Sequence, residues 1–371
     1  MSTVREIPFF VYPDVYKKEE KEILKIVADV GRRGAFILQK DLEEFEQNLA
    51  EYLGIKHVIG VGNATDGLFM LARAAGIGPG DEVIFCSHTM VATAAAMHFT
   101  GATPVPVEAG WDHEIDPSSV ENAITEKTKA ILPTQLNGRC CDMDTLRDIC
   151  SRYDLLLIED SAQALGAQYN GEVAGSFGKG GVISFYPAKT LGCLGDGGCI
   201  LTNDDEIAEK VRLYRDHGRG KDLEVECWAL NSRLDNLQAA ILNYKLRHYP
   251  NDIEQRRSIA RMYEERLSDV SQLVLPPGPD SDPDRFDIFQ NYEIEAERRD
   301  ELKKYLSDQG IGTLIQWGGK PVHLFPKLGF KQKLPYTESL FERMLMLPMN
   351  TSLKKDDVDY ICDKIKQFYG A

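Results

Sequence analysis

One lysine near the middle of the chain stands in a setting that could support covalent chemistry. Lys189 lies in the segment 184–192 (SFYPAKTLG), which predicts a turn after a short apolar strand, and a glycine-rich run at 195–198 follows. The amine of a lysine on such a turn can form a Schiff base with a carbonyl compound. The segment is only suggestive by itself, but two other segments supply groups that would complete such a site.

The second segment, 62–68 (GNATDGL), has the pattern of a helix start that follows a strand. A strand is expected over 57–61 and a helix from about Ala64 to Ala75. Free backbone N–H groups at a helix N-terminus bind phosphate, and the hydroxyl of Thr65 would add a donor. An ordinary helix cap is the alternative when the segment is considered alone. In combination with the lysine, the segment predicts a phosphate site.

The third segment, 159–163 (EDSAQ), follows an apolar strand. The carboxylate of Asp160 at the strand end could pair with a protonated pyridine nitrogen and keep the ring cationic. Gln163 lies three residues further along, on the same helical face if a turn begins there, and could hydrogen-bond a ring hydroxyl; a structural role is its alternative. A lysine, a phosphate site and such a carboxylate are the groups that pyridoxal phosphate (PLP) requires.

These residues predict PLP as the cofactor and give each side chain a task. Lys189 would hold the cofactor as an internal aldimine. After an incoming amine releases it, the same lysine would act as the base that moves a proton between two carbons. Ser184, five residues earlier, could reach the phosphate. No metal ion is expected.

The composition is typical of a water-soluble enzyme. The chain has 371 residues, 43% of them hydrophobic and 27% charged, with a net charge of −15. The negative charge argues against a nucleic-acid surface but is compatible with a local basic pocket for a small anion. No apolar run is long enough to span a membrane, and the first residues lack the regions of a signal peptide. The eight cysteines show no Cys-x-x-Cys spacing, so we expect reduced thiols and a cytoplasmic protein.

Apolar strands alternate with helical patterns through most of the chain. Strands are expected at 57–61, 82–85, 128–133 and 155–159. This alternation predicts an α/β fold with a mostly parallel central sheet that helices cover on both faces. Ligands of such sheets bind beyond the carboxyl ends of the strands, which is where Asp160 and the 62–68 segment lie.

The pattern changes at about residue 247. The expected elements after it are a long charged helix through 253–267, a loop rich in proline and aspartate at 276–284, a strand near 291–294, and helices near 299–309 and 356–368. We therefore predict two domains. The large domain would cover 1–246, including the N-terminal arm, and a smaller α+β domain over 247–371 would close over it.

Taken in order along the chain, these segments resemble the sugar aminotransferases of the DegT/DnrJ/EryC1/StrS family, which are PLP enzymes of the aspartate-aminotransferase fold type I. The resemblance covers nearly the whole chain and includes the three segments described above. The further matching segments are 34–38 (GAFIL), 80–84 (GDEVI), 231–235 (NSRLD), 237–240 (LQAA) and 347–348 (LP). Lysine at position 189 also separates the chain from related sugar dehydratases, which carry histidine there.

The resemblance implies roles that agree with the reading of the residues themselves. Lys189 is the Schiff-base lysine, Asp160 the partner of the pyridine nitrogen and Gln163 the partner of the ring hydroxyl. The residues implied to hold the phosphate are Ala64, Thr65 and Ser184. Asn231 would reach the phosphate bound by the neighbouring subunit, which implies a homodimer with two shared sites.

Two positions depart from the family pattern. Relatives usually have an aromatic residue that stacks on the PLP ring shortly after the strand at 82–85. This chain has Met90 in the aligned position, so either its thioether packs on the ring or His88 takes this role. The segment 135–138 (QLNG) stands where many relatives have a histidine, which leaves a polar contact there open.

Members of the family act on keto-sugars attached to nucleoside diphosphates and usually take the amine from L-glutamate. The resemblance therefore implies amino-sugar biosynthesis, for instance for lipopolysaccharide O-antigen. The sequence NSRLD at 231–235 is more similar to members that aminate carbon 3 than to those that aminate carbon 4, in which Asn-Tyr-Arg is more common. Amination of a 4-keto sugar is the alternative, and a non-catalytic regulator of the same fold is a more distant one.

An anionic diphosphate requires local positive charge. One candidate cluster is the segment 215–221 (RDHGRGK), with Arg215, Arg219 and Lys221, and the other is Lys320, His323 and Lys327. Arg233 is a further candidate for a substrate contact. Solvated surface charge is the alternative for both clusters. Trp317 could stack on the base or sugar of the substrate, or it could pack under a domain interface.

Overall fold

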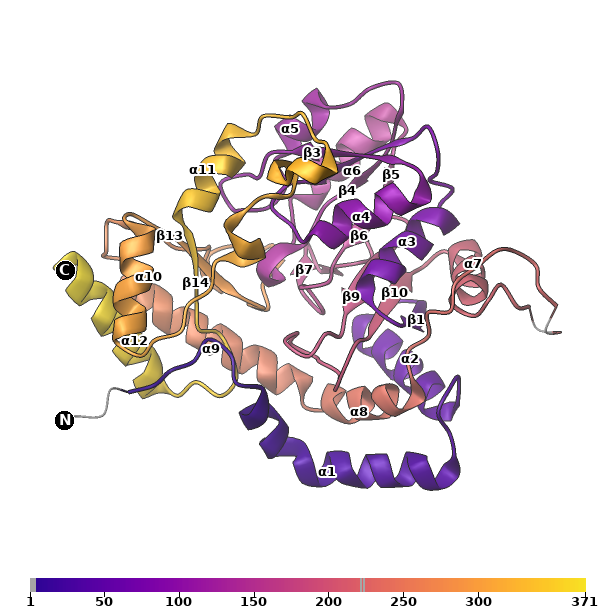
Figure 1. The fold of residues 1–371 in the computed structure, drawn as a ribbon, viewed down its shortest axis with the longest axis horizontal. Coiled ribbons are helices and arrows are strands. Elements are labelled where there is room, and N and C mark those ends of the chain that lie inside the picture. Colours follow the sequence, from indigo (N-terminus) through magenta and orange to yellow (C-terminus); the bar gives the residue numbers. More distant parts are fainter. Residues whose placement is uncertain (1–4, 221, 223) are drawn as a thin grey trace.

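The computed structural model of the protein describes residues 5–220, 222 and 224–371. The strands of its central sheet are β1 His57–Val61, β2 Glu82–Cys86, β3 Thr103–Val107, β4 Thr128–Leu132, β5 Leu156–Leu157, β6 Glu159–Asp160, β9 Gly181–Ser184 and β10 Gly198–Thr202. They form two groups, one in the order β3-β2-β4-β5 and one in the order β1-β10-β9-β6 (Figure 1). Every strand predicted for this region is present, although the one expected at 155–159 is divided between β5 and β6.

The two groups of strands join at the segment 156–160. There β5 pairs with β4 and β6 pairs with β9, both in parallel. Between them, the Ile158 N–H donates to the Ile131 carbonyl and the Glu159 N–H donates to the Gly180 carbonyl, so one stretch of chain belongs to both groups. β10 runs antiparallel to both of its neighbours, β1 and β9. The predicted α/β fold with a mostly parallel sheet is therefore confirmed.

Helices cover this sheet, and the one predicted from Ala64 is present as α3. The helices of the large domain are α1 Tyr12–Arg33, α2 Lys40–Leu53, α3 Ala64–Ala74, α4 Val91–Thr100, α5 Pro117–Asn122, α6 Met143–Tyr153, α7 Asp205–Arg215 and α8 Asn236–Leu246. In the part of the chain that the structure describes, no helix is long and apolar enough to cross a membrane.

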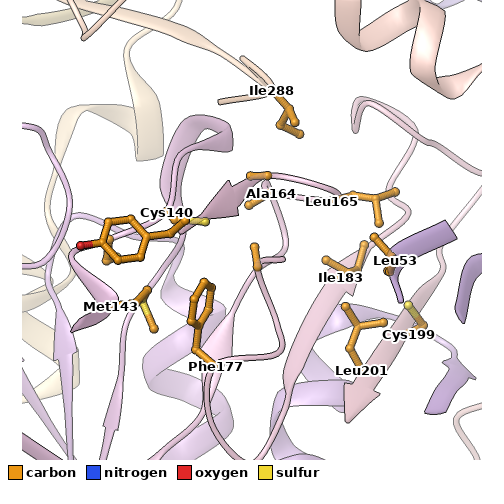
Figure 2. Close-up of a cluster of buried hydrophobic side chains, with 14 of the residues drawn as sticks. Leu53, Cys140, Met143, Ala164, Leu165, Phe177, Ile183, Cys199, Leu201 and Ile288 are labelled. Atoms are coloured by element: carbon orange, nitrogen blue, oxygen red, sulfur yellow. The ribbon is translucent and has the colours of Figure 1, made fainter. Parts of the chain in front are cut away.

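The sheet separates two hydrophobic cores. Successive side chains of a strand point to opposite faces, and on β10 Cys199 and Leu201 enter one core while Ile200 enters the other. Figure 2 shows Cys199 and Leu201 beside Ile183 of β9, with Leu53 of α2 close to them. Because both faces are buried, the strands are almost continuously apolar, which is the signal that made them predictable.

The predicted small domain, residues 247–371, contains all the elements expected there, and further ones. Its helices are α9 Tyr249–Leu267, α10 Arg299–Asp308, α11 Pro335–Arg343 and α12 Lys355–Tyr369, and its sheet is β11 Leu273–Val274, β13 Tyr292–Ala296 and β14 Met344–Leu347 in the order β11-β13-β14. The remaining short elements are β7 Gln168–Tyr169, β8 Glu172–Val173, β12 Arg285–Phe286, and the 3-10 turns η1 Leu136–Gly138, η2 Gln316–Gly319, η3 Val322–Leu324 and η4 Pro326–Leu328. α11, β11 and β14 were not predicted from the sequence.

The first described residues pack on the small domain, although the sequence analysis placed the N-terminal arm with the large one. Ile7 forms a parallel bridge with Ile311 and is buried in the core of the small domain. The Asn350 side chain donates to the Phe9 carbonyl at 3.1 Å. The arm therefore binds through backbone pairing and one apolar anchor, which leave little trace in the hydrophobic pattern of so short a segment.

After α7 the chain forms a hairpin that projects from the body of the large domain (Figure 1). The His217 N–H donates to the Leu230 carbonyl and the Glu226 N–H donates to the Gly218 carbonyl. At its edge the Trp228 side chain is fully exposed, with a relative accessibility of 101%. We refer to the described residues of this segment, 217–220, 222 and 224–230, as the projecting hairpin.

Candidate active site

Several of the predicted residues meet at one edge of the central sheet. The register pairs Asp160 at the end of β6 with Val182 of β9, and it pairs Ser184 at the end of β9 with Gly198 of β10. Gly198 in turn pairs with Val61, directly before the helix start at Ala64. A Cβ atom on Gly198 would lie 2.9 Å from the Ala64 nitrogen, so only glycine allows this close approach. The carboxyl ends of β1, β6 and β9 thus surround one position, as predicted.

The start of α3 is held in a fixed shape. Asn63 caps the helix because its side-chain oxygen accepts the Asp66 N–H at 2.9 Å. Ser232 links the preceding loop to the helix: its Oγ accepts the Gly62 N–H at 3.1 Å and donates to the Asp66 carboxylate at 2.6 Å. First-turn N–H groups of a helix have no intrahelical partner, and they attract anions. Ala64 and the half-buried Thr65 therefore lie in a preformed position for a phosphate.

The turn that carries Lys189 is fixed by residues outside it. The Lys189 N–H donates to the Tyr186 carbonyl at 2.8 Å. Gln290 brackets the lysine, since its amide nitrogen donates to the Ala188 carbonyl at 3.0 Å and its amide oxygen accepts the Thr190 N–H at 2.9 Å. The Thr190 hydroxyl also contacts the Tyr249 hydroxyl at 2.9 Å. The backbone on both sides of the amine is thereby held in place.

Asp160 and Lys189 influence each other electrostatically within this site. The Asp160 side chain is buried; one oxygen accepts the Thr93 hydroxyl at 2.6 Å and the other accepts the Ala162 N–H at 3.2 Å. Burial raises the pKa of Asp160, and the hydrogen bonds and Lys189 oppose this rise. Burial lowers the pKa of Lys189 to about 8, although Asp160 acts in the opposite direction. A much larger fraction of the Lys189 amine is therefore neutral near physiological pH than for an ordinary lysine, and the neutral amine is the form that a nucleophile requires.

The rate at which the cofactor-free protein captures PLP is expected to rise with pH around a midpoint of about 8, the pKa of Lys189. The neutral amine is the reacting form, so the rate should increase about tenfold between one pH unit below and one unit above the midpoint, and then level off. Absorbance after rapid mixing measures this rate. A profile that continues to rise towards the ordinary lysine value near 10.4 would contradict the lowered pKa.

Gln163 lies at the same edge, and its side chain is oriented by its neighbours. Its amide oxygen accepts the Asn137 N–H at 2.8 Å and the Asn291 side-chain N–H at 3.3 Å. Asn137 belongs to the segment 135–138, where many relatives have a histidine and where the sequence did not decide whether a polar contact is made. In the same segment, the Gln135 amide nitrogen donates to Glu159 at 2.7 Å in the interior, so Gln135 has a structural role.

The two candidates for a contact with the PLP ring have different surroundings. Met90 precedes α4 and is 48% exposed, whereas His88 is 1% exposed. The His88 ring packs edge-on against Phe341 and lies 3.5 Å from the Glu293 carboxylate. The His88 side chain is therefore occupied by buried contacts with Phe341 and Glu293. Met90 is the better candidate for the contact with the PLP ring.

The predicted basic residues of the first cluster lie at the base of the projecting hairpin. Arg219 and Arg233 both donate to the same Asp216 oxygen at 2.9 Å. Asn231 pairs with Asp216 through the backbone, and its side chain is exposed. Lys221, a further member of the cluster, lies outside the described residues. Since Asp216 offsets part of the positive charge, an incoming diphosphate would have to compete with this carboxylate.

The second cluster is not a group of free cations, which corrects the prediction for His323. Its side chain is buried, with one ring nitrogen 2.7 Å from the Ser87 hydroxyl and the other 3.3 Å from Glu338. Lys320 is exposed and lies over the Phe325 ring, and Lys327 is exposed as well. Trp317 packs against the large hydrophobic core, but its indole N–H is buried without a partner among the described residues.

Thr93, Gln290 and Tyr249 are functional neighbours that the sequence reasoning missed. Thr93 follows Met90 by one helical turn at the start of α4, which is a signal that could have placed it near the ring. Gln290 and Tyr249 have no such signal because they contact Thr190 of the lysine turn from positions 100 and 59 residues away in the sequence. Among the described residues, no group of histidine, cysteine, aspartate and glutamate side chains could hold a metal ion.

The comparisons with known proteins agree with this geometry. Residues 17–366 match the DegT/DnrJ/EryC1/StrS aminotransferase family. The chain is 42% identical over 369 residues to a protein of Geobacillus stearothermophilus named "pleiotropic regulatory protein", with 98% of each chain covered. It is 39% identical over 368 residues to dTDP-3-amino-3,4,6-trideoxy-alpha-D-glucose transaminase of Streptomyces venezuelae, covering 98% of this chain and 96% of that one. The crystal structure of S. venezuelae DesV in complex with a ketimine intermediate superposes with a TM-score of 0.94 at 38% identity, covering 99% of both chains.

Proposed function

The chain belongs to the DegT/DnrJ/EryC1/StrS aminotransferase family, and on this premise we propose that it transfers the amino group of L-glutamate to carbon 3 of a keto-sugar attached to a nucleoside diphosphate. The family depends on PLP, and several of its members in the comparisons are named as transaminases of nucleotide-linked sugars. The observation that carries the proposal is the meeting of Lys189, Asp160 and the start of α3 at one edge of the sheet.

The residues present fit PLP and divide its requirements between them. When bound, PLP stores the amino group between donor and acceptor. Lys189 would hold the cofactor through Nζ and, when released, take the proton from the α-carbon of the donor. Asp160 would pair with the ring nitrogen while the Thr93 hydroxyl fixes its carboxylate. The N-terminus of α3, together with Ser184, would receive the phosphate.

Support for carbon 3 comes from the relatives, several of which are named as transaminases of 3-amino sugars. Ser232, in the NSRLD segment that suggested carbon 3, is buried below the start of α3 and bridges Gly62 and Asp66. Its role is therefore to support the phosphate site and not to select the sugar carbon. Amination at carbon 4 is the second candidate function.

The proposed active unit is a homodimer in the cytoplasm that feeds amino-sugar synthesis, for example for O-antigen. The fully exposed Trp228 on the projecting hairpin favours burial against a second copy of the chain. Asn231, at the base of the hairpin, is exposed and would reach the phosphate site of that copy. Arg219, Arg233 and Trp317 remain proposed contacts of the nucleotide-linked sugar, and Lys221 is proposed with them.

A two-stage absorption experiment tests the proposal. L-Glutamate added to the PLP-loaded protein should remove the visible band of the lysine-bound cofactor. After the donor is washed out, a nucleotide-linked 3-keto sugar should restore the band, and the matching 4-keto sugar should restore it more slowly or not at all. Lys189→Ala is the control that cannot return to the starting spectrum.

The outcomes of this experiment distinguish carbon 3 from carbon 4, and an aminotransferase from a regulatory protein. Recovery with only the 4-keto sugar would replace carbon 3 with carbon 4. No change with any amino acid would overturn the proposed amino-group transfer and favour a regulatory protein, which is how the relative from G. stearothermophilus is named. The intact set of Lys189, Asp160 and Thr65 supports the enzyme instead.

A further inference from the structure

The amide of Gln163 has one chemically permitted orientation. The atom that lies 2.8 Å from the Asn137 backbone nitrogen is an acceptor, since a backbone N–H can only donate. The Gln163 oxygen must therefore face Asn137. Its NH₂ group points the other way and is available as a donor to a ring oxygen. This assignment follows from the partner's chemistry and not from a choice between two similar atoms.

A second donor reinforces this orientation. The side-chain nitrogen of Asn291, which directly precedes β13, lies 3.3 Å from the Gln163 oxygen and 2.9 Å from the Asn137 side-chain oxygen. The Asn291 N–H also donates to the Asn137 carbonyl at 3.3 Å. Asn291 thus holds both Gln163 and the residue that Gln163 faces.

The network continues into a buried group of charges. Asn137, whose φ of 55° lies in the left-handed region, accepts the Gln316 side-chain N–H on the same side-chain oxygen that accepts Asn291, and it contributes to lowering the pKa of the nearby Glu293. His113 lies 2.8 Å from Glu293 and His88 lies 3.5 Å from it. Burial would raise the pKa of Glu293, but the two imidazoles outweigh it and the net pKa is lowered. The Glu293 carboxylate beside the network is therefore ionised, and the two side-chain donors Asn291 and Gln316 fix Asn137 with its oxygen towards Asn291.

We propose that Asn291 is a positioning residue that acts through Gln163: it keeps the Gln163 NH₂ group directed at the ring hydroxyl oxygen of PLP. The inference rests on the proposed role of Gln163 but not on the identity of the sugar. A hydrogen-bond donor stabilises negative charge on the ring oxygen, and this makes the neighbouring imine nitrogen, which shares a proton with that oxygen, less basic. Loss or reversal of the donor should therefore raise the pKa of the imine that joins PLP to Lys189.

The test is a pH titration of the visible absorption band of the PLP-loaded protein in the absence of substrates. Asn291→Asp keeps the size of the side chain but replaces its donor with an acceptor, which would repel the Gln163 oxygen and displace the amide from the orientation that the Asn137 N–H sets. The imine pKa is expected to rise by about one unit, the scale of a hydrogen bond to a charged group. Asn291→Ala removes the donor without adding charge, so a smaller rise in the same direction is expected because the Asn137 N–H remains.

The double variant Gln163→Ala and Asn291→Asp distinguishes two effects on the imine pKa. One is the loss of the Gln163 orientation, and the other is the direct electrostatic effect of the new carboxylate at position 291. Gln163→Ala alone should raise the imine pKa, and adding Asn291→Asp to it should change the value by less than about a third of a unit, because the two changes act through the same side chain. The positioning role of Asn291 is overturned if Asn291→Asp raises the imine pKa equally in the unaltered protein and in the Gln163→Ala variant, or in neither of them. If Gln163→Ala itself has no effect, the role of Gln163 at the ring falls with it. Restoration of the band by a keto-sugar, as described above, tests the proposed function separately.

Discussion

Replacement of Lys189 with alanine is expected to reduce the rate of amino-group transfer by at least about 10³-fold. The variant loses both the amine that holds PLP and the base that moves the proton, and a positioned base alone contributes about 10²–10⁴-fold. The fold should be preserved, because the turn is held by backbone contacts to Tyr186 and by the Gln290 bracket, neither of which uses the lysine side chain. Single-turnover absorbance with L-glutamate measures the rate.

Two controls make the Lys189 result specific. Lys189→Arg keeps a positive charge but provides no neutral amine at accessible pH, and it should be as inactive as the alanine variant. Lys210→Ala removes a lysine on α7 that pairs with Glu206 on the surface, and it should behave as the unaltered protein does. A small primary amine in the buffer should restore part of the proton transfer to Lys189→Ala. If Lys189→Ala keeps a tenth or more of the activity, the assignment of the lysine is wrong.

Asp160→Asn is expected to slow the reaction with L-glutamate by about 10²–10³-fold with little change in stability. The amide retains the shape of the side chain and can still accept the Thr93 hydroxyl, but it cannot keep a ring nitrogen protonated. Asp160→Asn removes a negative charge that is already oriented in a buried site, and removal of such a group typically lowers the rate by this amount. Stopped-flow absorbance gives the rate, and thermal unfolding checks the fold.

Thr93→Val is the matched control for Asp160. It removes one hydrogen bond to the carboxylate but leaves the charge, so a decrease of about tenfold is expected, which corresponds to roughly 1.5 kcal/mol. If both variants lose the same amount of activity, the orientation of Asp160 matters more than its charge. Full activity of Asp160→Asn would exclude a role in ring protonation.

The central sheet was predictable because its strands are buried on both faces. β2 and β4 therefore stand out as apolar runs, and their bounds lie within one residue of the prediction. The strand at 155–159 was wrongly treated as a single element, because its division depends on which neighbour each residue pairs with. α1 and α2 were not predicted, although each ends at a glycine with positive φ, Gly34 and Gly54, which is a local signal for a helix end.

The site was predictable where its residues lie next to each other in the sequence. The segments at 62–68, 159–163 and 184–192 each contain their own strand end or turn. Gln290 and Asn291 were not recognised because neither has a local pattern: they act through contacts with residues 100 and 128 positions away. His323 was misjudged for a related reason, since a histidine between two lysines resembles a basic cluster until the structure shows Ser87 and Glu338 around its ring.

The N-terminal arm has a consequence for how the two domains can move. The chain crosses between them twice, once from the arm on the small domain into α1, and once along α9, whose Tyr249 belongs to the core of the large domain and whose Tyr263 belongs to that of the small one. Two crossings define a line, so any movement of one region relative to the other would be restricted to a rotation about it. Arg256 of α9 donates to the Phe289 and Gln290 carbonyls at 3.1 and 3.2 Å. These bonds link Gln290, which holds the backbone on both sides of Lys189, to the helix that forms the second crossing. In such a rotation the Lys189 turn, which Gln290 joins to α9, would be displaced less than elements far from this helix.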